Sequence, residues 1–341
     1  MAEPDFHRLT VAEVVDETRG ARSIVFAIPP ELEETFRYKP GQFLTLRIPS
    51  EDGGSMARCY SFSSAPHEGL HKVTIKQTGG YGSRWVCEQL HEGAEIDVLP
   101  PAGAFTPKTL DADFLFLAAG SGVTPVMSIV KSVLERGTGR ITLVYANRDD
   151  QQVIFADELT ALAHRHADRL VVVHWLESVQ GLPSTALLRT LVEPFAGRQA
   201  FVCGPGPFMD AAKDALEALG LPRRQVHVER FVSLTGNPFE EPPAAPEETE
   251  APASVRVDLD GVQRQLDWPR QTKLLDLLLN EGLDAPYSCR QGQCGACTCR
   301  ITAGEVKMLD NDVLDAEDIA DGFILACQSL PLTDEVTVSY E

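Results

Sequence analysis

The chain has 341 residues, of which 43% are hydrophobic and 23% charged, and its net charge is −20 at pH 7. This length predicts two or three domains, and the composition excludes collagen-like, coiled-coil and wholly disordered chains. The acidic balance argues against nucleic acid as a partner, because phosphate binding needs a basic face. No apolar run approaches the ~18 residues of a membrane span, and the first residues lack a secretory signal, so we expect a cytoplasmic protein.

The first part of the chain is rich in strand signals. Short β-type segments occur at Phe43–Ile48, Val73–Lys76 and Ile96–Val98, with Gly and Pro residues between them. We interpret residues 1–109 as an antiparallel β-barrel.

The pattern changes near Asp111, where short apolar strands begin to alternate with helical stretches. Strands joined by helices are typical of a parallel, doubly wound α/β sheet, which binds ligands at the carboxyl ends of its strands. We assign this fold to residues 110–235. The expected strands are 114–118, 141–145, 170–175, 200–203 and 226–228, and the expected helices begin at 124 or lie near 155–164, 184–191 and 207–219.

Residues 236–253 contain five prolines, five glutamates and no basic residue. Such a segment cannot bury much apolar surface, so it predicts an acidic, Pro-rich linker; a long surface loop within one domain is the alternative. Residues 254–341, the last predicted domain, hold 16 acidic and 7 basic residues. A solvated surface is the default interpretation of that excess, and a docking face for a basic partner is the alternative.

The strongest motif is the run Cys289-x4-Cys294-x2-Cys297, which Cys327 follows thirty residues later. This is the ligand spacing of a plant-type [2Fe–2S] cluster. Cysteines clustered in a cytoplasmic chain favour metal ligation over a disulfide framework. A zinc ribbon would need a second C-x2–4-C pair, which is missing here.

Two glycines within this run, Gly292 and Gly295, permit the tight curl that brings three thiolates together. Cys299 does not fit the spacing, and we interpret it as a buried apolar residue. The segment Ser288–Cys297 resembles the plant-type ferredoxins. That resemblance implies a β-grasp (α+β) fold for residues 254–341, with a helix over Lys273–Asn280.

Four further motifs follow one another in the first 232 residues, and each is weak alone. They are R-x-Y-S at Arg58–Ser61, a Gly-rich turn that opens a helix at Gly79–Ser83, Gly120–Pro125 after a strand, and Cys203–Pro205 at the end of a later strand. A helix N-terminus suits an anion, although it also occurs as a simple cap. Gly120–Pro125 lacks the last glycine of the G-x-G-x-x-G fingerprint but still lets a pyrophosphate approach the backbone.

In this order the four motifs resemble the ferredoxin–NADP reductase superfamily. The resemblance implies that Arg58 holds flavin phosphates, that Tyr60 stacks on the flavin ring and that Ser61 lies near its N5 atom. Glu229 falls in a segment similar to the one that approaches the flavin, with a plain sheet-ending strand as the alternative. We interpret Cys59 as a small core residue. The resemblance also implies a pyrophosphate site at Gly82 and Ser83, a nicotinamide-nucleotide site at Gly120, Gly122 and Thr124, Cys203 and Gly204 beside the nicotinamide, and Ser61, Cys203 and Glu229 as candidate catalytic residues.

A reductase followed by a ferredoxin is the arrangement of the phenylacetate- and steroid-degrading oxygenase reductases. Segments 110–125, 145–150, 174–183 and 326–328 are most similar to the reductases of 3-ketosteroid 9α-hydroxylases. The resemblance implies a monomer with FAD, NADH and a [2Fe–2S] cluster, and a Rieske-type non-haem iron oxygenase as partner. Hydride passes from NADH to flavin, and single electrons pass on to the cluster. The reductase of another oxygenase or of a desaturase, and a redox-sensing adaptor, are the alternatives.

Overall fold

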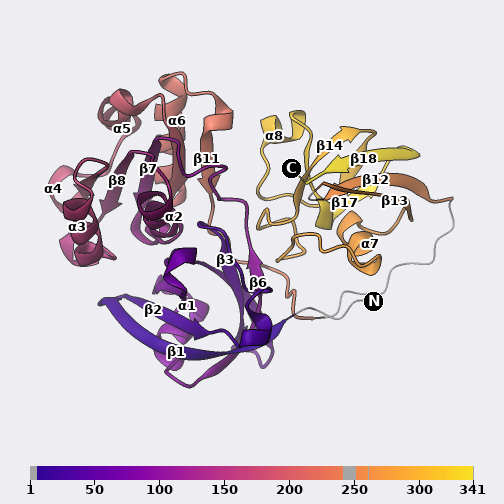
Figure 1. Ribbon diagram of the computed structural model, residues 1–341, viewed down its shortest axis with the longest axis horizontal. Coiled ribbons are helices and arrows are strands. Elements are labelled where there is room, and N and C mark those ends of the chain that lie inside the picture. Colours follow the sequence, from indigo (N-terminus) through magenta and orange to yellow (C-terminus); the bar gives the residue numbers. More distant parts are fainter. Residues whose placement is uncertain (1–5, 241–250, 260, 341) are drawn as a thin grey trace.

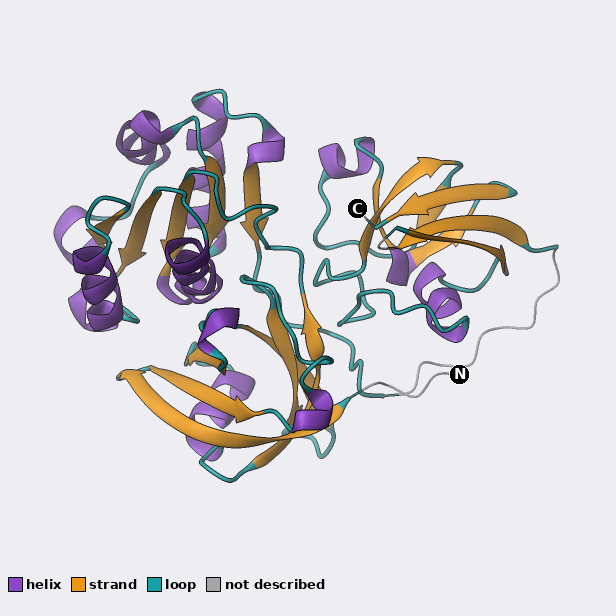
Figure 2. Ribbon diagram, viewed as in Figure 1, coloured by secondary structure: helices purple, strands orange, loops and turns teal. Residues whose placement is uncertain are grey.

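The structure, a computed structural model, describes residues 6–240, 251–259 and 261–340 (Figure 1). The described strands form three large sheets and one small one. Figure 2 shows the large sheets as separate groups, with most of the helices packed around one of them.

The first sheet is antiparallel, with the strand order β4-β3-β6-β1-β2-β5. Its two ends meet at an isolated bridge between Phe62 and Val73, so the sheet curls into a barrel around an apolar interior. The expected β-barrel is therefore confirmed. Its elements are β1 (His7–Thr18), β2 (Ala21–Ala27), β3 (Phe43–Pro49), β4 (Ser55–Ser61), β5 (His71–Lys76), α1 (Tyr81–Gln89) and β6 (Glu95–Ala102).

The second sheet is parallel, with the order β11-β10-β7-β8-β9. Helices α2 and α3 pack on one face and α5 and α6 on the other, which confirms the doubly wound fold. Every residue of β7 is buried, because helices cover both faces of the sheet. The elements are β7 (Phe114–Ala119), α2 (Val123–Arg136), β8 (Ile141–Asn147), α3 (Ala156–Arg165), β9 (Leu170–Leu176), α4 (Glu177–Gln180), α5 (Thr185–Val192), β10 (Gln199–Cys203), α6 (Gly206–Ala218) and β11 (Val226–Glu229).

The third sheet has the order β13-β12-β18-β14-β16, with β12 and β18 parallel at its centre. Helix α7 packs its leucines into the core of this sheet, as expected of a β-grasp fold. The elements are β12 (Ala253–Leu259), β13 (Val262–Trp268), α7 (Leu274–Asn280), β14 (Thr298–Ala303), β15 (Val306–Met308), α8 (Ala316–Ala320), β16 (Phe323–Leu325), β17 (Ser329–Pro331) and β18 (Glu335–Ser339).

The segment expected to be a linker is described only at its two ends, since residues 241–250 lie outside the described residues. Its first residues pack on the barrel. Phe239 is 5% exposed and its ring lies 5.8 Å from that of Phe6. Asn237 Nδ2 donates a hydrogen bond to the carbonyl oxygen of Ser55 at 3.1 Å. The chain therefore stays attached to the barrel as far as Glu240.

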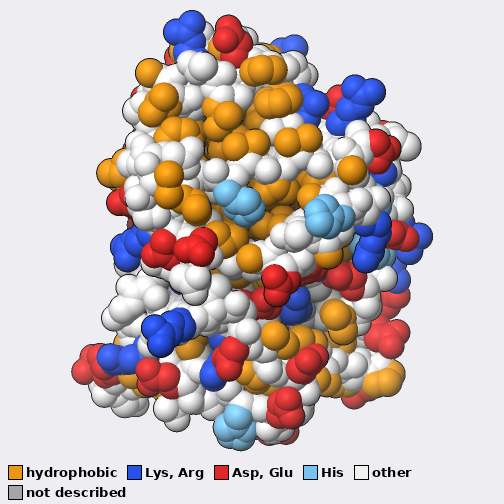
Figure 3. Space-filling view, turned by 90° about the vertical axis from the view of Figure 1, so that its left-hand side faces the viewer, with side chains coloured by type: hydrophobic (Ala, Val, Ile, Leu, Met, Phe, Trp, Pro, Cys, Tyr) orange, Lys and Arg blue, Asp and Glu red, His pale blue; other side chains and the backbone are white. Residues whose placement is uncertain are grey.

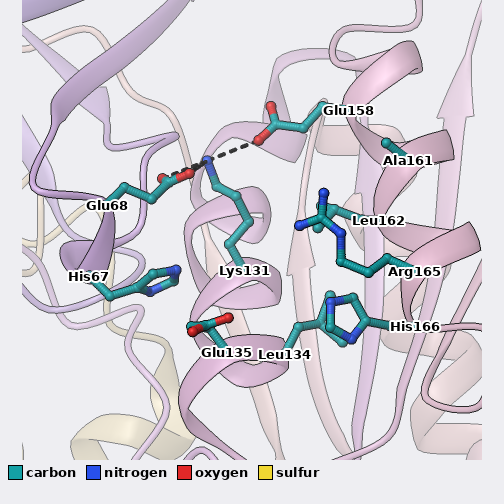
Figure 4. Close-up of a pocket in the computed structure, with 10 residues that line it drawn as sticks. All are labelled: His67, Glu68, Lys131, Leu134, Glu135, Glu158, Ala161, Leu162, Arg165 and His166. Carbon is teal, nitrogen blue, oxygen red and sulfur yellow. Dashed lines mark hydrogen bonds and ion pairs between the residues drawn. The ribbon is translucent and has the colours of Figure 1, made fainter.

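A buried ion-pair group joins the barrel to the second sheet's helices (Figure 4). Lys131 of α2, 5% exposed, has its Nζ 2.8 Å from Glu68 Oε2 and 3.1 Å from Glu158 Oε1. Glu68 belongs to the short helix η2 (Pro66–Glu68) of the barrel, and Glu158 to α3. A buried ammonium is tolerated only with such partners. The cavity of about 190 Å³ beside Lys131 is lined by none of the predicted site residues.

Apolar side chains gather on the α/β part of the surface, seen in Figure 3 from the side that lies at the left of Figure 1. The exposed large hydrophobic residues of the α/β part include Val171, Val179, Leu182 and Leu187. Among the described residues, no helix combines the length and the apolar character that a membrane crossing requires.

Candidate redox centres

Strand β4 carries the first predicted site residues. Side chains alternate along a strand, so Arg58 and Tyr60 share one face of β4. This face looks toward α1, because a Cβ atom added to Gly82 would lie 3.2 Å from Arg58 Cγ. Ser61, the last residue of the strand, is 5% exposed. The structure thus brings Arg58 and Gly82 together, as a shared phosphate site would require.

The start of α1 has an open N-terminus. Gly80 is the N-cap and makes no side-chain cap hydrogen bond. Ser83 Oγ donates to the carbonyl oxygen of Gly80 at 3.1 Å and accepts from Thr78 N at 3.3 Å. The first-turn N–H groups of α1 therefore have no capping side chain, and Arg58 lies beside the same turn, an arrangement suited to an anion.

The predicted nucleotide residues meet at the carboxyl ends of β7 and β10. Gly122 lies in the turn after β7 and closely approaches the end of β10. An added Cβ would lie 2.2 Å from the Cys203 carbonyl oxygen and 2.7 Å from Gly204 N. Gly120 starts the short helix η3 (Gly120–Gly122) directly after β7. Thr124 Oγ1 donates to the Ser121 carbonyl oxygen at 3.0 Å, which ties this turn to α2.

Glu229 lies beside Cys203, since the two residues pair in the register of β10 and β11. Burial raises the pKa of Glu229 to about 8 and also raises the pKa of the Cys203 thiol. Both groups are therefore neutral at pH 7. A neutral surface at this place favours entry of a dinucleotide, which carries two phosphate charges.

We expect the pH profile of NADH oxidation to report on Glu229. Below pH 8 the carboxyl is protonated, and above pH 8 it gains a negative charge that repels the nucleotide. The kcat/KM for NADH, measured with ferricyanide as acceptor, should fall severalfold as the pH rises through 8. Glu229→Gln should remove this inflection, and the exposed-site control Glu193→Gln should retain it. An identical inflection in both variants would assign the titration to another group.

Two residues that sequence analysis missed adjoin the same turn. Lys76 ends β5, and its Nζ lies 3.5 Å from the position of a Cβ added to Gly120. Desolvation, and secondly the charge of Arg148, lowers the pKa of Lys76. The Tyr145 hydroxyl donates to the Gly120 carbonyl oxygen at 3.0 Å and so holds the turn in place. The sequence signal for Lys76 is its position at the end of a strand, just before the Gly79–Gly80 turn.

The four predicted cysteine ligands come together in the third part of the chain. Cys289 N donates a hydrogen bond to Cys294 Sγ at 3.4 Å, and Cys327 N donates one to Cys297 Sγ at 3.5 Å. Cys289, Cys297 and Cys327 are each exposed by 2% or less. Within the described residues no group of three or more His, Cys, Asp or Glu side chains surrounds a single-ion position. These contacts place Cys289 next to Cys294, and Cys327 next to Cys297.

The backbone around these thiols presents donors to sulfur. The N–H groups of Gln291 and Gln293 both donate to Cys289 Sγ at 3.3 Å. The pKa of Cys289 is lowered, first by the thiols of Cys294 and Cys327 and then by these N–H groups. The two N–H groups thus stabilise negative charge on Cys289 Sγ, which a thiolate-bound metal cluster requires.

The curl of the loop depends on left-handed backbone conformations. Gly292 and Gly295 have φ angles of 75° and 70°, as their place in the motif suggests. Arg290 also has a positive φ, 56°, which no feature of the motif predicts. Cys299 is 2% exposed within the β-grasp core, in agreement with its interpretation as an apolar residue.

Three family profiles match the chain in succession. They are described as oxidoreductase FAD-binding domain (residues 8–106), oxidoreductase NAD-binding domain (residues 116–214) and 2Fe-2S iron-sulfur cluster binding domain (residues 257–332). The FAD, nicotinamide and iron–sulfur cofactors expected from the sequence are therefore confirmed at the level of domains.

Curated relatives match almost the whole chain. The 3-ketosteroid-9-alpha-monooxygenase ferredoxin reductase component of Rhodococcus rhodochrous is 53% identical, over 97% of this chain and 96% of its own. The protein of the same name from Mycobacterium tuberculosis (strain CDC 1551 / Oshkosh) is 56% identical, over 98% and 95%. A component of the 1,2-phenylacetyl-CoA epoxidase of Escherichia coli (strain K12) is 35% identical, over 98% of each chain.

Solved structures share the fold. A phthalate dioxygenase reductase aligns over 99% of this chain and 100% of its own, with a TM-score of 0.59 and 23% identity. Full-length CYP116B46 from Tepidiphilus thermophilus aligns with a TM-score of 0.66 and 24% identity, over 98% of this chain and 42% of its own. With this fold, the three domains and the curated relatives together, the chain belongs to the ferredoxin reductase components of the 3-ketosteroid-9-alpha-monooxygenases, a family of oxidoreductases.

Proposed function

We propose that this chain carries electrons from NADH through FAD and a [2Fe–2S] cluster to a Rieske-type oxygenase that hydroxylates a 3-ketosteroid. When bound, the flavin accepts hydride from the nicotinamide and releases electrons singly to an iron–sulfur centre. The observation that carries the proposal is the position of β4: Arg58 and Tyr60 lie on one face of this strand, and Cys289 and Cys294 pack near its other face.

For the flavin we assign the face of β4 that looks toward α1. Arg58 and the first-turn N–H groups beside Gly82 and Ser83 would bind the flavin phosphates. Tyr60 would cover the ring, and Ser61 would reach its reactive edge. Burial raises the pKa of Tyr60, so its hydroxyl stays protonated in the working pH range.

For the nicotinamide nucleotide we assign the carboxyl ends of β7 and β10. Gly120, Gly122 and Thr124 would admit the pyrophosphate close to the backbone, with the ammonium of Lys76 beside it. Cys203 and Gly204 would border the nicotinamide. Glu229, neutral at pH 7, would lie at the inner end of the site without repelling the dinucleotide.

For the [2Fe–2S] cluster we assign Cys289, Cys294, Cys297 and Cys327. The fit rests on the backbone contacts that join Cys289 to Cys294 and Cys327 to Cys297, and on further N–H groups aimed at Cys289 Sγ. The neighbouring pairs of thiols suit two irons that share four cysteine ligands.

We expect this protein to prefer NADH to NADPH by roughly tenfold or more in kcat/KM. Asp149 follows β8, where the adenosine ribose would lie, and Gln152 N donates to its Oδ1 at 3.1 Å. A carboxylate held there repels a 2′-phosphate, although Arg148 nearby opposes this effect.

The discriminating variant is Asp149→Asn, which keeps the oxygen that accepts from Gln152 but removes the charge. This variant should lower the ratio of kcat/KM for NADH to kcat/KM for NADPH severalfold. Asp157→Asn on α3 should leave that ratio unchanged. A parent protein that favours NADPH would contradict the assignment.

The oxygenase partner is expected to meet an acidic surface. Residues 236–341 carry −14 of the total −20. Part of this charge is used internally, since Arg223 Nη2 lies 2.9 Å from Asp318 Oδ1. Asp310 is exposed next to the cysteine loop, where its carbonyl oxygen approaches Gly292. A basic docking patch on the partner would be attracted over about 10 Å at 0.1 M salt.

The test is reconstitution with the purified oxygenase of a 3-ketosteroid-9-alpha-monooxygenase, with NADH-dependent steroid hydroxylation as the readout. Turnover is expected, and it should fall as salt rises, while NADH-to-ferricyanide activity stays nearly constant. A hydroxylation rate that does not change with salt concentration would contradict electrostatic docking. Absence of hydroxylation beside normal cytochrome c reduction would assign the chain to another oxygenase.

We also propose that the protein works as a monomer. Light scattering after size exclusion should give a mass close to the 37.2 kDa of one chain. If the mass is that of a dimer, the exposed apolar residues around Val171 and Leu187 are the candidate contact surface.

A further inference from the structure

The cysteine loop, residues 288–297, is covered by the barrel. Two of its cysteines and Ala296 belong to small apolar groups that also include barrel residues. Ala296 is 7% exposed although it lies on the outside of the β-grasp sheet. The barrel side chains in these groups come from β3, β4 and β6: Phe43, Ala57, Cys59, Leu99 and Ala102.

Buried polar groups pair across the same contact. Thr45 Oγ1 of β3 and Ser288 Oγ share a hydrogen bond of 2.6 Å, and both residues are 1% exposed. Gln293 Oε1, on a side chain that is 6% exposed, accepts from Thr235 N at 2.8 Å and from Thr235 Oγ1 at 3.2 Å. A buried hydroxyl without a partner is costly, and Thr45 and Ser288 satisfy each other only while the loop lies on the barrel. We call these two pairs, Thr45–Ser288 and Thr235–Gln293, the latch.

The latch holds the loop on the strand that carries the flavin residues. Cys59 lies between Arg58 and Tyr60 in β4, so its side chain points to the opposite face. There Cys59 packs with Cys294, and its Sγ is 3.4 Å from Thr45 Oγ1. The thickness of one strand therefore separates the candidate flavin face from the cysteine loop.

We propose that the latch is an electron-transfer contact, in which Thr45 and Ser288 are positioning residues that keep the cysteine loop within reach of the flavin through β4. This inference rests on the function proposed above and adds which residues set the transfer distance. With both cofactors bound, single electrons would cross this contact from the flavin side of β4 to the cysteine loop, and no bond forms or breaks in the latch. Tunnelling falls steeply with distance, so loosening the loop slows this step and leaves hydride transfer from NADH unaffected.

The test is the holoprotein with Thr45→Val, which keeps the side-chain shape and removes the hydroxyl. Iron content, flavin content and the visible spectrum of the cluster should match the parent. NADH-to-ferricyanide turnover should stay within about twofold of the parent, whereas stopped-flow reduction of the cluster by NADH should slow at least fivefold. Small-angle X-ray scattering should show a larger radius of gyration, since the cysteine-bearing part is held less firmly.

Thr45→Ser, which restores a hydroxyl, should recover most of the rate. Thr302→Val, at an exposed position of the β-grasp sheet, is the matched control and should behave as the parent. If Thr45→Val does not fold, Thr235→Val removes the hydroxyl of the second latch pair, leaving the Thr235 N–H bond, and is judged by the same measurements.

The outcomes separate the two proposals. A parent protein whose cluster is not reduced by NADH would contradict the proposed function itself. The other outcome is that the parent transfers electrons normally and Thr45→Val matches it in the rate of cluster reduction and in radius of gyration. This outcome would contradict the role proposed for the latch but not the proposed function.

Discussion

Cys294→Ser is expected to remove the cluster and to lower NADH-dependent cytochrome c reduction about 100-fold or more. Cys294 is one of the four cysteines proposed to bind the cluster, and serine is a poor ligand for an iron that prefers thiolate. The flavin should remain, because the barrel has its own apolar core. NADH-to-ferricyanide turnover should therefore survive, since that acceptor can take electrons from flavin.

Iron analysis and the visible spectrum check the loss of the cluster, and flavin content checks the barrel. Cys299→Ser is the matched control: the same substitution at a buried cysteine of the same sheet, outside the motif. Cys299→Ser should keep the cluster and lower only the free energy of unfolding. Loss of flavin and ferricyanide activity in soluble Cys294→Ser protein would contradict independent folding of the two parts.

Gly122→Ala should lower kcat/KM for NADH about 100-fold while flavin and iron contents stay normal. The new methyl group would lie 2.2 Å from the Cys203 carbonyl oxygen, so either the turn after β7 or the end of β10 must move. A displacement of about 1 Å between reacting groups can cost 10²-fold in rate. Gly122 has a φ of −61°, so its backbone angles suit alanine and the effect is one of space alone.

Gly206→Ala tests this explanation, because a Cβ there meets no atom within 4 Å. This control should oxidise NADH at the parental rate. Parental kcat/KM in Gly122→Ala would show that the two loops are not held at the separation seen here, and the nicotinamide assignment at Cys203 would then fail.

The motifs and the order of the modules could be predicted from the sequence, because they depend on local spacing. The curl at Gly292 and Gly295, the contact of Gly82 with Arg58 and the approach of Gly122 to Cys203 all follow from small residues placed where a backbone or a cofactor must come close. Glycines in such motifs are recognisable without coordinates.

Long-range partners could not be predicted in this way. The sequence favours a plain core position for Cys59, whereas Cys59 lies at the contact with Cys294, because nothing local indicates which sheet covers the second face of β4. Lys131 sits in an apolar stretch of α2, and its carboxylate partners come from η2 and α3. Thr45 and Ser288 are 243 positions apart, so only the tertiary fold reveals their hydrogen bond.

The burial of the cysteine loop also bears on dioxygen. Cys289, Cys297 and Cys327 are exposed by at most 2%, and among the four proposed ligand cysteines only Cys294 is partly accessible. Three of the four thiols are therefore shielded from dissolved oxygen and iron chelators in this structure. With the function proposed above, such shielding would lower the loss of electrons to superoxide before they reach the partner. Measured peroxide release per NADH should accordingly be low in the parent and should rise when the cover of the loop is loosened.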